Sequence, residues 1–139
     1  MMWSDAYLLG VDQIDQQHKQ LIGVLDDLAK CVRKDHDIAA KQCKQTISFM
    51  KTYAITLFSA EEMLMEKIEY PLLEGHREKH DRFKRSIHEL ELRLMQSDYS
   101  VDTMQEVVHV LTNWWLFHIV KEDKKLAPYI SKNEDKIAD

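Results

Sequence analysis

The chain has 139 residues, the size of a single domain. Apolar residues make up 45% and charged residues 31%, which excludes a disordered chain, and only 3 Gly and 2 Pro argue against collagen-like and many-turned β-sandwich folds. The net charge is −5 and the sequence has no basic stripe, so nucleic acid is not expected as a partner.

Turn signals divide the chain into an arm, four long segments and a tail. Asp37 and Ser100 are predicted N-caps of the second and fourth segments, and Tyr70-Pro71 is expected to end the second. We therefore expect one domain over residues 1–139, with an N-terminal arm over 1–11, helices over about 12–34, 38–69, 72–96 and 101–121, and a C-terminal tail over 122–139.

The two cysteines suggest a reducing compartment. Cys31 and Cys43 form neither a CxxC motif nor a zinc-binding spacing, so we expect two reduced thiols. The sequence shows no signal-peptide pattern and no apolar run of the roughly 20 residues that a membrane span requires. A cytoplasmic domain without a membrane segment is expected.

Apolar residues recur at alternating steps of three and four in each predicted helix. The second helix illustrates this seam with Cys43, Ile47, Met50, Ala54, Leu57, Glu61, Leu64 and Ile68. Such spacing is typical of a left-handed bundle in which every seam faces one core. Because short connections make successive helices antiparallel, we predict an all-α, up-down-up-down four-helix bundle.

Five polar residues interrupt these seams: His18, Glu61, His76, His80 and His118. They lie near the start of the first and third helices and near the end of the second and fourth, which share one end of an antiparallel bundle. A buried charge without a partner typically costs several kcal/mol, so five such groups in one layer require a common partner. A metal ion binds neutral imidazole and ionised carboxylate together, and this layer is therefore predicted to be a metal site.

Asp123 is a further candidate ligand, five residues after His118. In a regular α-helix it would lie about 140° around from His118, away from the seam. A widened turn or a helix end near Lys121 would bring it inward, and we predict such an irregularity.

The set of candidate ligands does not by itself identify the metal. Imidazole and carboxylate without thiolate suit iron, manganese or zinc, and two carboxylates that can bridge suggest a pair of ions. A single ion held by His76, His80, His118 and one acid is the alternative.

The remaining histidines, His36, His88 and His109, are interpreted as exposed or boundary residues. Core packing is the role predicted for three aromatic and three methionine side chains: Phe83, Trp114, Trp115, Met50, Met63 and Met65. The aromatic residues would form the walls of a dry pocket.

The motifs of the chain resemble those of hemerythrin-like domains, in particular the bacterial ones. The resemblance extends over nearly the whole chain and is carried by Trp3, Gly10-Val11, Ile14-Asp15-x-Gln17-His18, Tyr53, Phe58-x-x-Glu61-Glu62, Met65, Tyr70-Pro71, His76-x3-His80-x-x-Phe83, and Trp114 through His118-Ile119-x-x-x-Asp123.

The resemblance implies a non-haem diiron centre with an oxo or hydroxo bridge. By position, His76, His80 and His118 would hold one iron, His18 would hold the other, and Glu61 and Asp123 would bridge them. Dioxygen or another small ligand would bind at the iron that has fewer protein ligands. In bacteria such domains are often fused to signalling outputs such as diguanylate cyclases or chemoreceptors.

The sequence departs from the family pattern at Leu57, where the family has a histidine directly before the phenylalanine. The second iron would then keep His18 as its only imidazole. Water or a small anion would fill the vacancy, another group such as Glu62 or the N-terminal arm would swing in, or the second ion would bind weakly.

This departure makes a sensory or regulatory redox module the leading functional hypothesis, and a binding module is expected rather than an enzyme. An iron with an extra exchangeable position admits small ligands and oxidises readily. The alternatives are a diiron oxidase or a peroxide- or nitric-oxide-handling enzyme, an oxygen carrier, and a structural bundle with a vestigial site.

Overall fold

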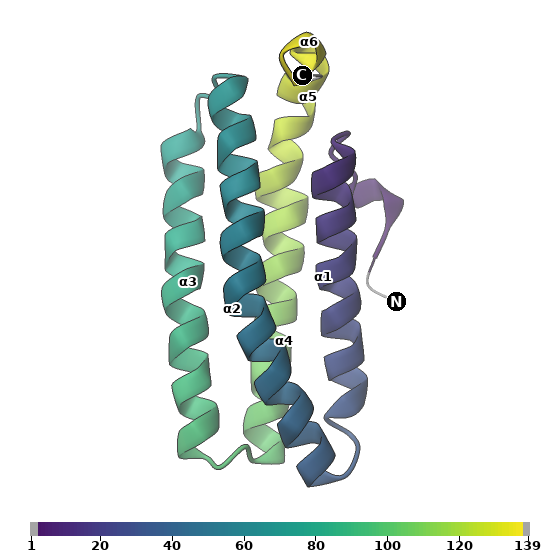
Figure 1. Ribbon diagram of the computed structural model, residues 1–139, viewed down its shortest axis with the longest axis vertical. Helices are drawn as coiled ribbons and strands as arrows, with labels where there is room; N and C mark the ends of the chain where they lie inside the picture. Colours follow the sequence, from purple (N-terminus) through teal and green to yellow (C-terminus); the bar gives the residue numbers. More distant parts are fainter. Residues whose placement is uncertain (1–2, 138–139) are drawn as a thin grey trace.

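Four long helices pack side by side in the computed structural model, which describes residues 3–137 (Figure 1). The helical elements are η1 (Asp5–Tyr7), α1 (Asp12–Cys31), α2 (His36–Lys67), α3 (Leu73–Gln96), α4 (Val101–Phe117), η2 (His118–Glu122), η3 (Asp123–Leu126), α5 (Ala127–Lys132) and α6 (Glu134–Ile137). The chain runs down α1, up α2, down α3 and up α4 in the view of Figure 1. The predicted all-α antiparallel bundle is confirmed.

The predicted seams form the core. Every seam position of the second helix, from Cys43 to Ile68, is buried, and so are the polar seam residues of the other three helices. Val101, the first residue of α4, is exposed because it lies at the end of the bundle. Met63 is also exposed, so its predicted packing role is wrong, whereas Met50 and Met65 are fully buried.

Helix ends differ from the predictions for reasons of backbone chemistry. The side chain of Asp35, not of Asp37, caps α2 by accepting from the Asp37 N–H, so that α2 begins at His36. Ser100 caps α4 as predicted, accepting from the Thr103 N–H.

At its other end, α2 ends before Pro71 is reached. Glu69 adopts φ 53°, and the Tyr70 N–H donates to the Met65 carbonyl at 2.9 Å. This is the hydrogen-bond pattern of a Schellman motif, in which one residue in the left-handed conformation stops the helix. The proline therefore follows a turn that the preceding residues have already made.

The N-terminal arm is fixed against the start of α1. Asp15 is buried, and its two carboxylate oxygens accept from the backbone N–H groups of Leu9 at 2.7 Å and Gly10 at 3.1 Å. Gly10 has φ +102°, a conformation that favours glycine. Lys124 donates to the Leu8 carbonyl, so the arm also contacts the segment after α4.

Beyond α4, the stretch predicted as a tail folds into short helices at the end of the bundle where the arm joins α1 (Figure 1). Residues 1, 2, 138 and 139, the extreme ends of the predicted arm and tail, lie outside the described residues. The cysteines are free and buried, and none of the helices within residues 3–137 has the length and hydropathy to cross a membrane.

Candidate metal centre

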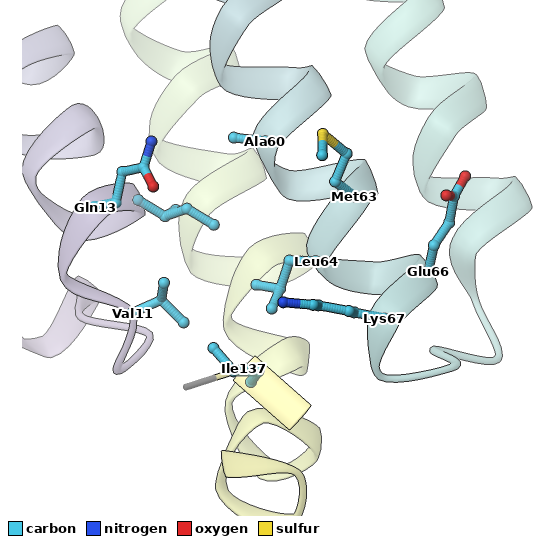
Figure 2. Close-up of a pocket in the computed structure, with 9 residues that line it drawn as sticks. Val11, Gln13, Ala60, Met63, Leu64, Glu66, Lys67 and Ile137 are labelled. Carbon is cyan, nitrogen blue, oxygen red and sulfur yellow. The ribbon is translucent and has the colours of Figure 1, made fainter. Parts of the chain in front are cut away.

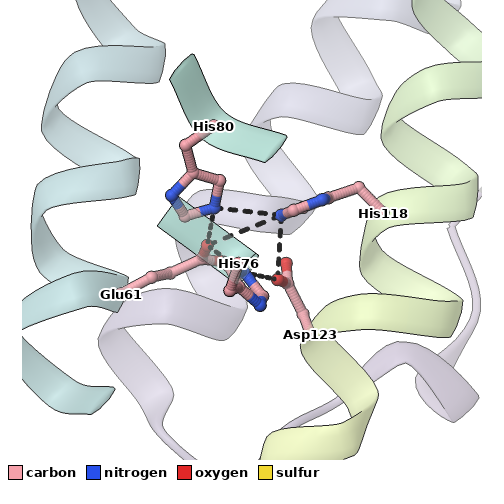
Figure 3. Close-up of side chains that lie close together, drawn as sticks. All are labelled: Glu61, His76, His80, His118 and Asp123. Carbon is pink, nitrogen blue, oxygen red and sulfur yellow. Dashed lines mark hydrogen bonds and ion pairs between the residues drawn. The ribbon is translucent and has the colours of Figure 1, made fainter. Parts of the chain in front are cut away.

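All six predicted ligands are buried and come together at one end of the bundle. Ligand atoms of five of them lie within 4.8 Å of one another: Glu61, His76, His80, His118 and Asp123 (Figure 3). His18 joins this cluster through its Nε2, which lies 2.8 Å from Glu61 Oε2 and 3.2 Å from Asp123 Oδ2. The other histidines, His36, His88 and His109, are exposed, as predicted.

Asp123 reaches the cluster because the helix widens after α4. Residues His118–Glu122 form a π-helical turn, and the Asp123 N–H donates to the His118 carbonyl five residues earlier. One extra residue in the turn places residues five apart on the same face. The predicted irregularity is thus confirmed, and Asp123 Oδ1 lies 3.1 Å from His118 Nε2.

Each carboxylate divides its two oxygens between the two sides of the cluster. Glu61 turns Oε2 toward His18 and Oε1 toward His80, 3.1 Å from its Nε2. Asp123 turns Oδ2 toward His18 and Oδ1 toward His76, 2.9 Å from its Nε2. Two acids with this arrangement separate a three-histidine side from a one-histidine side.

Several of these polar atoms approach one another without forming hydrogen bonds. Glu61 Oε1, His76 Nε2 and both oxygens of Asp123 have no hydrogen-bond partner among the described residues, although all are buried. His80 Nε2 and His118 Nε2 lie 3.0 Å apart, and two imidazole nitrogens at this distance must share a proton or a cation. Natural proteins leave few buried polar atoms unpaired, so this donor set fits metal ions better than protons alone.

Protons balance the charge of the layer in the metal-free protein. Burial lowers the pKa of His18, but the adjacent carboxylates of Asp123 and Glu61 outweigh this effect and raise the pKa to about 10. The same two acids outweigh burial at His76 and raise its pKa to about 9. Burial favours the protonated form of Glu61, yet its hydrogen bond with His18 and its close contacts with His76 and His80 lower its pKa to about 2. Metal cations would therefore replace protons held on His18 and His76 at neutral pH.

A relay of polar residues that the sequence reasoning missed orients His80. Glu62 Oε2 accepts from His80 Nδ1 at 2.8 Å, while Glu62 Oε1 accepts from Arg77 Nε at 3.1 Å. Burial alone would raise the pKa of Glu62. The hydrogen bonds from His80 and Arg77 outweigh burial, so the pKa of Glu62 is lowered. A proton on Nδ1 leaves the Nε2 lone pair facing the cluster, as metal-binding histidines require.

Glu62 therefore faces the back of His80, where it is not available to fill the position beside Leu57. Its role had a detectable signal in the sequence, because Glu62 and Arg77 are opposite charges that flank the seams of neighbouring helices.

Aromatic rings cover two of the imidazoles. Phe58 stacks on His80 with ring centroids 3.8 Å apart, and Trp114 stacks on His118 at 4.6 Å. His18 lacks comparable polar support, because its Nδ1 is buried without a hydrogen-bond partner among the described residues. The three-histidine side is thus held more firmly than the His18 side.

Two surface hollows adjoin this end of the bundle. The larger, of about 540 Å³, lies between the start of α1, the end of α2 and α6 (Figure 2). Its wall includes Ile14, one turn before His18, and Ala60, directly before Glu61. The smaller, of about 260 Å³, includes His118 and the exposed ring of Phe117. His118 lines the smaller hollow directly, whereas none of the six predicted ligands lines the larger one, and all six stay buried.

Known proteins with similar sequences place the chain in a family. Residues 9–130 match the hemerythrin HHE cation binding domain. The chain is 28% identical over 138 residues to a bacteriohemerythrin of Stenotrophomonas maltophilia, with 99% of this chain and 86% of that protein covered. It is 27% identical to a bacteriohemerythrin of Pseudomonas aeruginosa, covering 88% and 76%, and 26% identical to one of Clostridium acetobutylicum, covering 89% and 96%. The resemblance is confirmed by these matches: the chain belongs to the hemerythrin HHE cation binding family and is a bacteriohemerythrin-like domain.

Proposed function

We propose that the domain binds two iron ions, bridged by Glu61, Asp123 and an oxo or hydroxo group, and serves as a redox or small-ligand sensor. Membership of the hemerythrin family implies iron binding and small ligands such as oxygen. The observation that supports a pair of ions is the division of each carboxylate between a three-histidine side and the His18 side. When bound, a pair of irons supplies reversible electron transfer and open positions for dioxygen or another small ligand.

In this proposal His76, His80 and His118 hold one ion and His18 holds the other. The protein contributes neutral imidazoles in a fixed orientation, two ionised acids and a largely dry surrounding. Phe58 and Trp114 keep water from the faces of His80 and His118. Glu62 keeps the proton of His80 on Nδ1.

The sensory role rests on Leu57, which is fully buried on the seam one turn before Glu61. Leucine cannot bind a metal, so the His18 ion keeps more positions for water, small anions or dioxygen than the ion held by three imidazoles. An ion open to exchange suits detection better than long-term oxygen storage. A fused signalling output, such as a diguanylate cyclase, and a cytoplasmic location belong to the same proposal.

Iron content and the absorption spectrum test this function. Protein produced with ample iron is expected to hold about two irons per chain, one for each side of the cluster, and to show the bands of oxo-bridged ferric iron that bleach on reduction. Protein that contains no metal, or only zinc, under these conditions would contradict the proposal. Sustained turnover of oxygen with a reductant would favour an oxidase over a sensor.

Glu62→Gln should weaken iron binding by roughly 10–100-fold, because the carboxylate behind His80 is lost while the ring remains. The affinity is measured by competition with a coloured chelator. Glu66→Gln is the matched control, since Glu66 also pairs with Arg77, at 2.9 Å, and contacts no histidine of the cluster in the described residues. Equal losses in the two variants would mean that Glu62 acts only through Arg77.

A further inference from the structure

Trp115 carries a polar atom that nothing in the fold explains. Its side chain is fully buried, and its indole Nε1–H has no hydrogen-bond partner among residues 3–137. The rest of the indole packs against rings, with Phe83 at 5.0 Å and Phe58 at 5.4 Å between centroids. A phenylalanine or leucine would fill such an apolar space without burying an N–H, so the unpaired donor indicates an absent acceptor.

The position of Trp115 along α4 places it one turn further into the bundle than the layer formed by the six predicted metal ligands. It lies three residues before His118, just as Leu57 lies four residues before Glu61 on α2. On each helix, the residue one turn further from the cluster end of the bundle than the predicted ligand lies in the same next layer of the core. The side chains of that layer are Leu21, Leu57, Phe58, Phe83 and Trp115, each 2% exposed or less.

Two features therefore share this layer. One is Leu57, which cannot bind a metal and which, under the proposed function, leaves a coordination position open on the ion of His18. The other is the Trp115 N–H, the unpaired indole donor of the same layer. The centroid of the Trp115 ring lies 6.5 Å from the centroid of the His118 ring, and the two rings are nearly perpendicular. The indole therefore borders the layer of predicted metal ligands.

We propose that the Trp115 N–H donates a hydrogen bond to a small ligand held at the open position beside Leu57. The inference rests on the proposed diiron function. It makes Trp115 a specificity-determining residue that favours small anions able to accept a hydrogen bond, such as azide, over ligands that lack an acceptor. A site built to pair a buried donor rejects a ligand that leaves this donor unpaired.

The test is an azide titration of the iron-loaded ferric protein, followed by absorption, in the unmodified protein, in Trp115→Phe and in Phe83→Leu. Trp115→Phe is expected to lower azide affinity by about tenfold or more, since one hydrogen bond to an anion is lost. Phe83→Leu is the matched control, because it loosens the same layer without removing an N–H, and should change the affinity by less than about threefold.

A second readout does not depend on any variant. In ultraviolet resonance Raman spectra of the unmodified protein, azide should shift the tryptophan band that reports hydrogen bonding of the indole N–H. Equal azide affinity in a folded Trp115→Phe would overturn the inference. The absence of the Raman shift would overturn it as well, and this result holds even if Trp115→Phe folds poorly. A protein that holds no iron would instead overturn the proposed function.

Discussion

His80→Ala should lower the midpoint of thermal unfolding of the iron-loaded protein by roughly 10–20 °C. A ligand at a thousand times its Kd contributes about 4 kcal/mol to the free energy of unfolding, and each kcal/mol is worth several degrees for a domain of this size. His80 contacts Glu61, Glu62 and His118 at 3.1, 2.8 and 3.0 Å, so its loss would remove a proposed ligand from the three-histidine side of the cluster.

His88→Ala is the matched control, because His88 lies on the same helix two turns later and is exposed. Its midpoint should stay within about 2 °C of the unmodified protein, as for most surface substitutions. The same variants are then measured after iron has been removed by a chelator. If His80→Ala lowers the midpoint equally with and without iron, the histidine acts through packing and the site is a remnant in a structural bundle.

Leu57→His is expected to strengthen the His18 half of the centre. The new imidazole would lie one turn before Glu61 on the same buried seam, where it could share the ion that His18 holds in the proposed centre. We expect the second iron to be retained about tenfold or more tightly against a chelator, and the reduced protein to oxidise more slowly in air because one exchangeable position is closed.

Iron retention and the lifetime of the reduced protein in air-saturated buffer measure this effect. Leu57→Gln is the control, since it introduces a polar side chain of similar length that is a poor iron ligand. An unchanged spectrum and lifetime in Leu57→His would show that the open position does not lie beside residue 57.

Much of the fold follows from the sequence because the seams repeat with so few errors. The bundle, its antiparallel order and the gathering of polar residues at one end all depend on the positions of residues along helices, which short connections preserve. The widened turn before Asp123 was predictable on a different ground, because a regular helix would have turned this acid away from His118 and out of the cluster. Helix ends were less predictable, because the choice between Asp35 and Asp37 as the cap depends on a backbone turn that either residue allows.

The parts of the centre that escaped prediction depend on side-chain direction. The contact of Glu62 with His80 crosses between two helices away from the seam, so the spacing of core residues does not reveal it, and its signal in the sequence is the pair of opposite charges on Glu62 and Arg77. The unpaired N–H of Trp115 is equally invisible in sequence, where the residue is only one more large apolar group on the seam. Hydrogen-bond partners, unlike burial, require the positions of atoms.

The widened turn after α4 also joins the polar cluster to the N-terminal arm. Asp123, at the end of this turn, faces the cluster, while its neighbour Lys124 donates to the Leu8 carbonyl of the arm. One peptide bond thus separates the acid inside the bundle from the cation that anchors the opposite end of the polypeptide. Under the proposed function, a movement of Asp123 that accompanies a change at the ions would therefore act on the N-terminal arm through Lys124 and on the short helices that follow it.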